Sequence, residues 1–269
     1  IAIGKDFDKE TGKLSKSNLL ALDKTKAESL AESFLNSDWK VTKVEQKPAK
    51  QNPYPPFITS TLQQEGVRKL RMSSQQVMRN AQKLYEEGYI TYMRTDSVSL
   101  SSEAINGSRN AIKSLFGAEY LPETPPIYKS KVKNAQEAHE AIRPAGATFN
   151  TPKDIQGKLD GQEWKLYDMI WKRTLASQMK SAKLLKTNVE ISDGKAMFDA
   201  HGKVIEFPGF LKVYVEDIDD PNKERDDKES ILPPMQEGES VTGKEFTPNQ
   251  HFTKPSPRFT EATLIKELE

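Results

Sequence analysis

The chain has 269 residues, with 40 basic and 39 acidic side chains and a formal net charge of +1. That length allows one large domain or two ordinary ones, and the balanced charge excludes a histone-like basic protein while leaving room for a local basic groove. The lack of cysteine excludes disulfides, cysteine zinc sites and thiol nucleophiles. No apolar run approaches the roughly 18 residues of a transmembrane helix.

The first segment, residues 1–51, is predicted to be rich in β-structure. Short apolar runs in "IAI", "NLLALD" and "WKVTKVEQK" indicate strands, and an amphipathic helix is expected over 26–37 with Thr25 as its cap. Four prolines in "PAKQNPYPPF" then favour a linker. The chain begins without methionine and stops inside a helical pattern, so we expect a piece of a longer protein.

Residues 52–179 are predicted to form a helical domain. Apolar residues recur at helical spacing in "ITSTLQQEGVRKL", "MSSQQVMRNAQKLYEEG", "LSSEAINGSRNAIKSLFG" and "LDGQEWKLYDMIWKRTLASQM". Gly88 stands where a helix would end in a left-handed conformation. The expected N-terminal caps are Ser73 with Gln76, Ser101, and either Ser60 with Gln63 or Thr61 with Gln64.

Residues 180–248 return to the two-residue period of strands. The predicted strands are "LKTNVEIS", "KAMFDAHG", "KVIEFPGFLKVYV" and "SVTGKEF", with a charged loop at 216–230. After two further prolines, residues 249–269 begin another helix and are expected to start a separate domain. The order predicts an α+β multidomain protein, in which the helical domain is inserted into a β-rich domain formed by 1–51 and 180–248. Two adjacent strands would then serve as its hinge.

The stretch "EEGYITYMRTDSVS" contains a candidate nucleophile, Tyr92. The phenol of a free tyrosine has a pKa near 10, so a nucleophilic tyrosine needs a cation or base close by. In an extended chain, Ile90, Tyr92 and Arg94 face the same way, so the phenol and the guanidinium can both point at one phosphate. From spacing alone, a strand that places one aromatic ring in the core is the simpler interpretation.

A second candidate stretch is "NAQEAHEAIRP". His139 and Arg143 are four residues apart and would share one face of a helical turn, which suits an anionic ligand. A solvated polar turn is the simpler alternative. The three histidines, His139, His201 and His251, are too far apart in sequence to suggest a metal cluster.

Four motifs together resemble one protein family. "PFITSTLQQEG", "LYEEGYITYMRTDSVSLS", "EAHEAIRP" and "HFTKPSPRFTEATLIKELE" are similar, in this order, to type IA DNA topoisomerases and most of all to their bacterial topoisomerase I branch. The resemblance implies a monomeric, ATP-independent bacterial enzyme of the cytoplasm and nucleoid. It would relax negatively supercoiled DNA by single-strand cleavage, strand passage and religation. Residues 1–51 with 180–248 would be the family's domain II, 52–179 its domain III, and 249–269 the start of domain IV.

The resemblance also implies roles for five residues. Tyr92 would attack a phosphodiester of single-stranded DNA, forming a 5′-phosphotyrosine and freeing a 3′-hydroxyl. Arg94 would bind the scissile phosphate, and His139 would support cleavage by hydrogen bonding. Arg143 is either a phosphate contact or a structural partner, and Asp96 is expected to orient Arg94. Tyr92 should be exposed on this chain.

In this family Mg²⁺ is bound by an acidic cluster of a Toprim domain, and no counterpart of that segment occurs in the sequence. We therefore expect no metal ligands in these 269 residues and no DNA cleavage by them alone. A topoisomerase III or a reverse gyrase is an alternative within the class, although "EAHEAIRP" and Met93 favour topoisomerase I. A non-catalytic nucleic-acid-binding module is the alternative from another class, and it predicts that Tyr92→Phe leaves every activity unchanged.

Overall fold

A computed structural model describes residues 6–8, 11, 13–16, 20–129, 139–215, 228–250, 252 and 257–269. The chain divides into two compact units. One is formed by Ile1–Lys47, Lys186–Lys203 and Ser230–Arg258, and the other by Pro48–Leu185, Val204–Glu229 and Phe259–Glu269. The protein is thus a mixed helix and sheet structure, while the insertion of one domain into the other stays a prediction.

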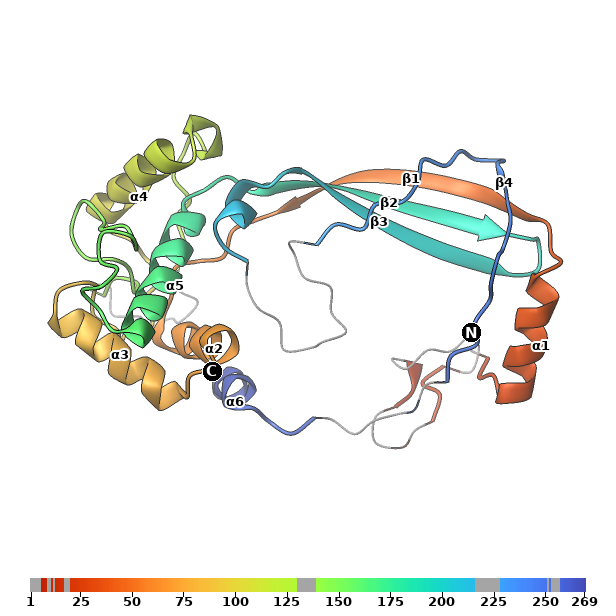
Figure 1. Ribbon diagram of the computed structural model, residues 1–269, viewed down its shortest axis with the longest axis horizontal. Helices are drawn as coiled ribbons and strands as arrows, with labels where there is room; N and C mark the ends of the chain where they lie inside the picture. The colour runs from red at the N-terminus through yellow and green to blue at the C-terminus, as the bar shows by residue number, and fades with distance from the viewer. Residues whose placement is uncertain are drawn as a thin grey trace. The chain divides into compact units, whose positions relative to one another are not determined.

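A four-stranded sheet has the order β3-β2-β1-β4 (Figure 1). Its strands are β1 (Trp39–Gln51), β2 (Ala182–Ser192), β3 (Met197–Phe207) and β4 (Ser240–Val241). β1 is longer than predicted, because it continues through Pro48 into the expected linker. Proline is tolerated there since β4 pairs antiparallel with β1 only at Trp39 and Lys40, which leaves the later part of β1 without a β4 ladder to interrupt.

β3 corrects a second expectation, because it is one strand where the sequence suggested two separated at Gly202. An added Cβ at Gly202 would lie 3.1 Å from the backbone oxygen of Ser230, and Lys203 forms a β-bridge with Ser230. The glycine therefore allows a close approach of two chain segments and does not mark a turn. Of the last predicted strand, "SVTGKEF", only the two residues of β4 are in a strand. The strand expected in "IAI" and most of the charged loop lie outside the described residues, and Leu20–Asp23 form no strand.

The helices are α1 (Lys24–Phe34), α2 (Thr59–Leu70), α3 (Ser74–Glu86), α4 (Ser102–Leu115), α5 (Gly161–Ser177) and α6 (Glu261–Leu268). The predicted caps of α3 and α4 are confirmed: Ser73 Oγ accepts from the amide of Gln76, and Ser101 Oγ caps α4. The cap predicted for α1 is wrong, since Asp23 takes that place. Both pairings predicted for α2 are also wrong, because Thr61 bonds back to Ile58.

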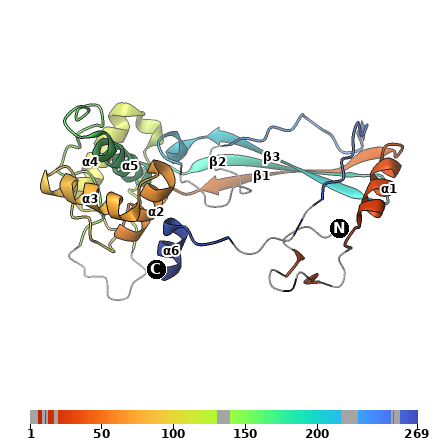
Figure 2. The same ribbon diagram turned by 60° about the horizontal axis from the view of Figure 1, so that its bottom comes forward.

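α5 lies at the centre of the helices and contacts α2, α3 and α4 (Figures 1 and 2). Its buried face includes Leu166, Tyr167, Ile170 and Leu175, each at most 1% exposed. Burying side chains of this size is the main source of stability for such a core. The 3.6-residue period predicted Tyr167, Ile170 and Leu175 on this face, and the structure adds Leu166 to it.

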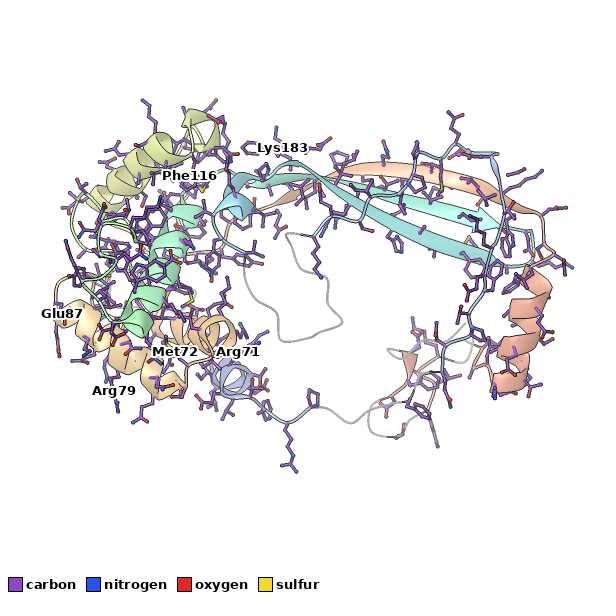
Figure 3. All side chains as sticks on the ribbon, viewed as in Figure 1. Arg71, Met72, Arg79, Glu87, Phe116 and Lys183 are labelled. Atoms are coloured by element: carbon purple, nitrogen blue, oxygen red, sulfur yellow. The ribbon has the colours of Figure 1, made fainter. Side chains whose placement is uncertain are left out.

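α3 follows α2 after a tight reversal (Figure 3). Arg71 ends α2 with a φ of 57°, in the left-handed region that non-glycine residues rarely adopt. The next side chain, Met72, is 3% exposed and belongs to the core. This reversal sets the direction of α3, whose far end carries the chain into the Tyr92 segment.

α6 packs against α2 within the helical compact unit. The carboxylate of Glu261 accepts from the amide of Ser74 at 2.6 Å, and Gln64 donates to Glu269 at 3.2 Å. The assignment of 249–269 to a separate domain stays a prediction.

The other compact unit has a small aromatic core of its own. Phe34, Trp39, Phe198 and Phe246 meet with ring centroids 5.1–5.6 Å apart. Trp39 is 3% exposed and also donates from its indole nitrogen to the carbonyl of Phe34 at 3.0 Å. Such edge-on and tilted ring contacts stabilise a unit that has few aliphatic side chains to bury.

Candidate active site

The chain leaves α3 through a turn and runs into the Tyr92 segment. Gly88 has a φ of 76°, which suits the glycine predicted to end the helix. Beyond it, the exposure of side chains alternates. Tyr92 is 44% exposed, and Arg94 and Asp96 are also exposed. The buried side chains between and after them are Met93, Thr95 and Ser97. Tyr92 and Arg94 are therefore both accessible to solvent on this segment.

Two features of this segment differ from the prediction. It is not a strand, because its β-pairing within the described residues is limited to an isolated bridge between Ile90 and Pro144. Ile90 is 2% exposed and points into the core, so it does not share the side of Tyr92. The ring of Tyr92 instead meets that of Tyr85 on α3, edge to face, with centroids 5.3 Å apart.

The hydroxyl of Thr59 holds the backbone on both sides of Arg94. It donates to the carbonyl of Met93 at 2.9 Å and accepts from the amide of Thr95 at 2.9 Å. The amide of Thr59 donates to the carbonyl of Thr95 at 2.9 Å. Thr59 is the first residue of α2, so the end of a helix fixes the position of the segment.

A second threonine holds the residue before Tyr92. The hydroxyl of Thr91 donates to the carbonyl of Ala141 at 2.8 Å and accepts from the amide of Arg143 at 3.0 Å. The amide of Thr91 donates to the carbonyl of Arg143 at 2.9 Å. The two motifs that the sequence singled out are therefore neighbours in space. Neither threonine was predicted as a site residue, although Thr59 lies in the quoted "PFITSTLQQEG".

His139 is exposed at the start of the described part of the second motif, whose residues 134–138 lie outside the described residues. The following residues are extended, with the amides of Ala141 and Ile142 donating to the carbonyls of Ser99 and Phe57 at 2.8 and 2.9 Å. The helical turn on which His139 and Arg143 were expected to share a face is therefore absent from residues 139–144.

Arg143 is 6% exposed, and its guanidinium is surrounded by acceptors. It donates to both carboxylate oxygens of Glu140 at 2.8 and 2.9 Å. It also donates to the carbonyls of Pro144 and Gly146 at 2.8 and 3.0 Å, and more weakly to Ser101 Oγ at 3.5 Å. Since a guanidinium has five N–H donors, these contacts occupy all of them.

Glu140 completes this network. Burial raises the pKa of Glu140, but the hydrogen bonds from Arg143 and from Ser101 outweigh it and hold that pKa below its usual value. The amide of Ser101, the residue that caps α4, donates to Glu140 at 2.8 Å. The ion pair thus ties the start of α4 to the segment that bonds Thr91.

In the part of the chain that the structure describes, no three histidine or carboxylate side chains come together in a way that could hold a metal. Tyr92, Arg94 and His139 offer a phenol, a guanidinium and an imidazole, which suit an anion better than a cation. Among the described helices, none is both long and apolar enough to cross a bilayer.

Comparisons with known proteins agree on one family. The profile described as DNA topoisomerase matches residues 2–269. The whole chain is 52% identical to DNA topoisomerase 1 of Streptomyces coelicolor, covering 28% of that protein, and 49% identical to DNA topoisomerase 1 of Mycolicibacterium smegmatis, covering 29%. The structure of full-length topoisomerase I from Thermotoga maritima matches 94% of this chain and 40% of that one, with 35% identity and a TM-score of 0.74. The chain therefore spans less than a third of the length of these curated relatives.

Proposed function

The chain belongs to the DNA topoisomerase family, and from this premise we propose that Tyr92 is the nucleophile that cleaves single-stranded DNA. The phenolic oxygen attacks a backbone phosphorus, the bond to the 3′ oxygen breaks, and that oxygen takes up a proton. The product is a 5′-phosphotyrosine and a free 3′-hydroxyl, which later reverses the step and reseals the strand. The observation that carries the proposal is the exposure of both Tyr92 and Arg94, on a segment fixed by Thr59 and Thr91.

Arg94 is proposed to bind the scissile phosphate. A guanidinium that contacts the phosphate stabilises the negative charge that builds up on the phosphoryl oxygens. His139 is proposed to support cleavage by hydrogen bonding from the neighbouring segment. Asp96 is also exposed, two residues after Arg94, and is proposed to orient it. For Arg143 we propose the structural alternative, because its donors are already occupied within the protein.

The whole protein is proposed to be a monomer that relaxes negatively supercoiled DNA in the bacterial nucleoid without ATP, since the phosphotyrosine conserves the bond energy. Magnesium bound elsewhere in that protein would supply further charge stabilisation at the phosphate. These 269 residues alone are proposed to be inactive, because the described residues bring together no metal-binding group.

The test uses the full-length protein that carries this chain, with Mg²⁺ and negatively supercoiled plasmid. We expect Tyr92→Phe to abolish both relaxation and the covalent protein–DNA adduct, because the phenyl ring keeps the contact with Tyr85 but lacks the attacking oxygen. Tyr89→Phe is the matched control and should retain both. Mapping the adduct to any residue other than Tyr92 would overturn the assignment, and full activity of Tyr92→Phe would favour a non-catalytic binding module.

A further inference from the structure

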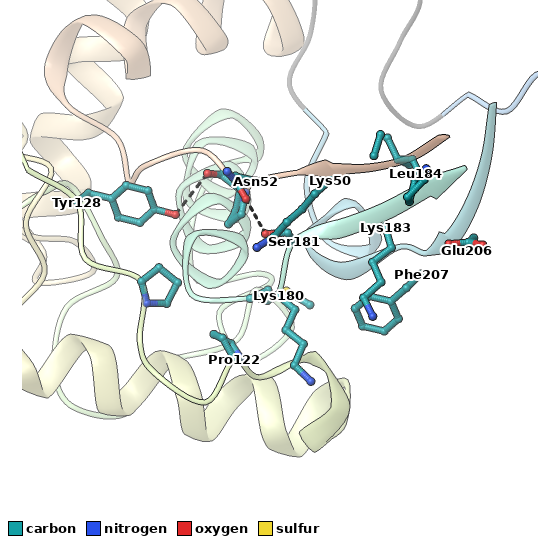
Figure 4. Close-up of a pocket in the computed structure, with 15 residues that line it drawn as sticks. Lys50, Asn52, Pro122, Tyr128, Lys180, Ser181, Lys183, Leu184, Glu206 and Phe207 are labelled. Carbon is teal, nitrogen blue, oxygen red and sulfur yellow. Dashed lines mark hydrogen bonds between the residues drawn. The ribbon is translucent and has the colours of Figure 1, made fainter. Parts of the chain in front are cut away.

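A hollow of about 700 Å³ opens beside the parts of β1, β2 and β3 that belong to the helical compact unit (Figure 4). All of its lining residues belong to that unit, and none is Tyr92, Arg94 or His139. Its size is in the range of pockets that bind small molecules or single residues of a polymer. The hollow is therefore separate from the proposed cleavage site.

The charge of the hollow is positive. Lys50 comes from β1, while Lys180 and Lys183 flank the start of β2. No ion pair within the described residues involves any of these three lysines. The single carboxylate in the lining is Glu206. An uncompensated group of ammonium ions favours an anionic occupant.

The remaining lining is apolar and aromatic. Its apolar members are Phe207, Met179, Leu184, Ala49, Pro48, Pro53, Pro122 and Pro126. The wall next to them is held by hydrogen bonds: Ser181 donates to Asn52 at 2.8 Å, and the hydroxyl of Tyr128 donates to the carbonyl of Ser177 at 2.9 Å. Burial raises the pKa of Tyr128 to about 12, so it stays neutral and adds no negative charge to the wall.

An occupant that matches this lining carries negative charge and flat rings together. Single-stranded nucleic acid has both, since its phosphates pair with lysines while its bases stack on aromatic and apolar side chains. We propose that this hollow is a second binding site for single-stranded DNA, in which Lys50, Lys180 and Lys183 contact the backbone and Phe207 contacts a base. The proposal rests on the proposed function only in taking DNA as the substrate, because binding here requires no cleavage.

The test measures binding of a fluorescent thymidine oligonucleotide to the 269-residue chain by anisotropy at low salt. In the triple variant Lys50→Gln/Lys180→Gln/Lys183→Gln we expect affinity to fall about tenfold and the salt dependence, as the slope of log K against log salt, to decrease by about 2. The matched control is Lys113→Gln/Lys158→Gln/Lys195→Gln, which removes three exposed lysines outside the hollow and should lower affinity by less than about twofold. Equal losses in both variants would overturn the proposal.

A second measurement tests the aromatic contact without altering charge. Phe207→Leu should weaken binding of the thymidine oligonucleotide but not of an abasic oligomer with the same number of phosphates, because only the former can stack. Equal effects on both oligomers, or displacement of the oligonucleotide by an acidic peptide of equal charge as readily as by unlabelled DNA, would overturn the choice of single-stranded DNA.

The two proposals can fail separately. If Tyr92→Phe abolishes the adduct in the full-length protein while the triple lysine variant binds DNA normally, only the second site is wrong. If the triple variant loses affinity while Tyr92→Phe still forms an adduct, only the cleavage assignment is wrong.

Discussion

Replacing Arg143 by methionine separates a structural role from a DNA-binding one. The substitution removes the partner of Glu140 and leaves two carbonyls, those of Pro144 and Gly146, without a donor. Breaking a buried ion pair typically costs about 3–5 kcal/mol of the free energy of unfolding. The side chain of Glu140 is 26% exposed, so water can partly solvate the carboxylate left behind. We therefore expect a loss near the lower limit, about 3 kcal/mol.

Urea unfolding of the 269-residue chain measures this loss. Arg109→Met is the matched control, because Arg109 donates a hydrogen bond to the neutral carbonyl of Pro122 at 3.0 Å, and its loss should cost only about 1 kcal/mol. Binding of single-stranded DNA by folded Arg143→Met should stay within about twofold of the unmodified chain. A stability change below about 0.5 kcal/mol, together with a large loss of DNA affinity, would refute the reasoning and identify Arg143 as a phosphate contact.

Three further tests concern the packing and the ion pair around the site. Thr59→Val keeps the shape of the side chain but leaves the amide of Thr95 without its acceptor, so the free energy of unfolding should fall by about 1–3 kcal/mol in urea titrations. An unchanged free energy of unfolding would show that the Thr59 hydroxyl does not hold this segment. Gly107→Ala should lower the thermal midpoint despite the helix preference of alanine, because its Cβ would meet a backbone oxygen, whereas Gly161→Ala has open space and should not. The lowered pKa of Glu140 means that its contribution to stability is present at neutral pH and is lost as the pH falls below about 4.5 through the folded value. Glu140→Gln should flatten this acid dependence of unfolding, and equal acid dependence in both proteins would show that another group is responsible.

Local sequence patterns predicted local structure. Ser73 and Ser101 were identified as caps because a cap depends only on the next three residues, and the buried face of α5 followed from its period. The family resemblance connected Tyr92 with "EAHEAIRP", and the hydrogen bonds of Thr91 bring these two motifs together.

The predictions were wrong where the local conformation depends on contacts with segments far away in the sequence. "YITY" has the composition of a strand, yet its backbone hydrogen bonds join it to Leu84, Arg143 and Ala145, outside any sheet. β1 extends well beyond the two residues that pair with β4 and lies beside β2, which comes much later in the chain, so Pro48 could not be interpreted from its neighbours. The ion pair of Arg143 with Glu140 likewise depends on an extended conformation that the helical spacing did not suggest.

The alternation of exposed and buried side chains along residues 92–97 has a practical consequence for capturing the protein with its substrate. The side chains that hold the segment in place point inward, and those proposed to do chemistry point outward. An inactive variant at Tyr92 should therefore keep the shape that the active protein presents to DNA. Such a variant should bind DNA without cutting it, which suits the capture of an uncleaved complex for crystallography or cryo-electron microscopy.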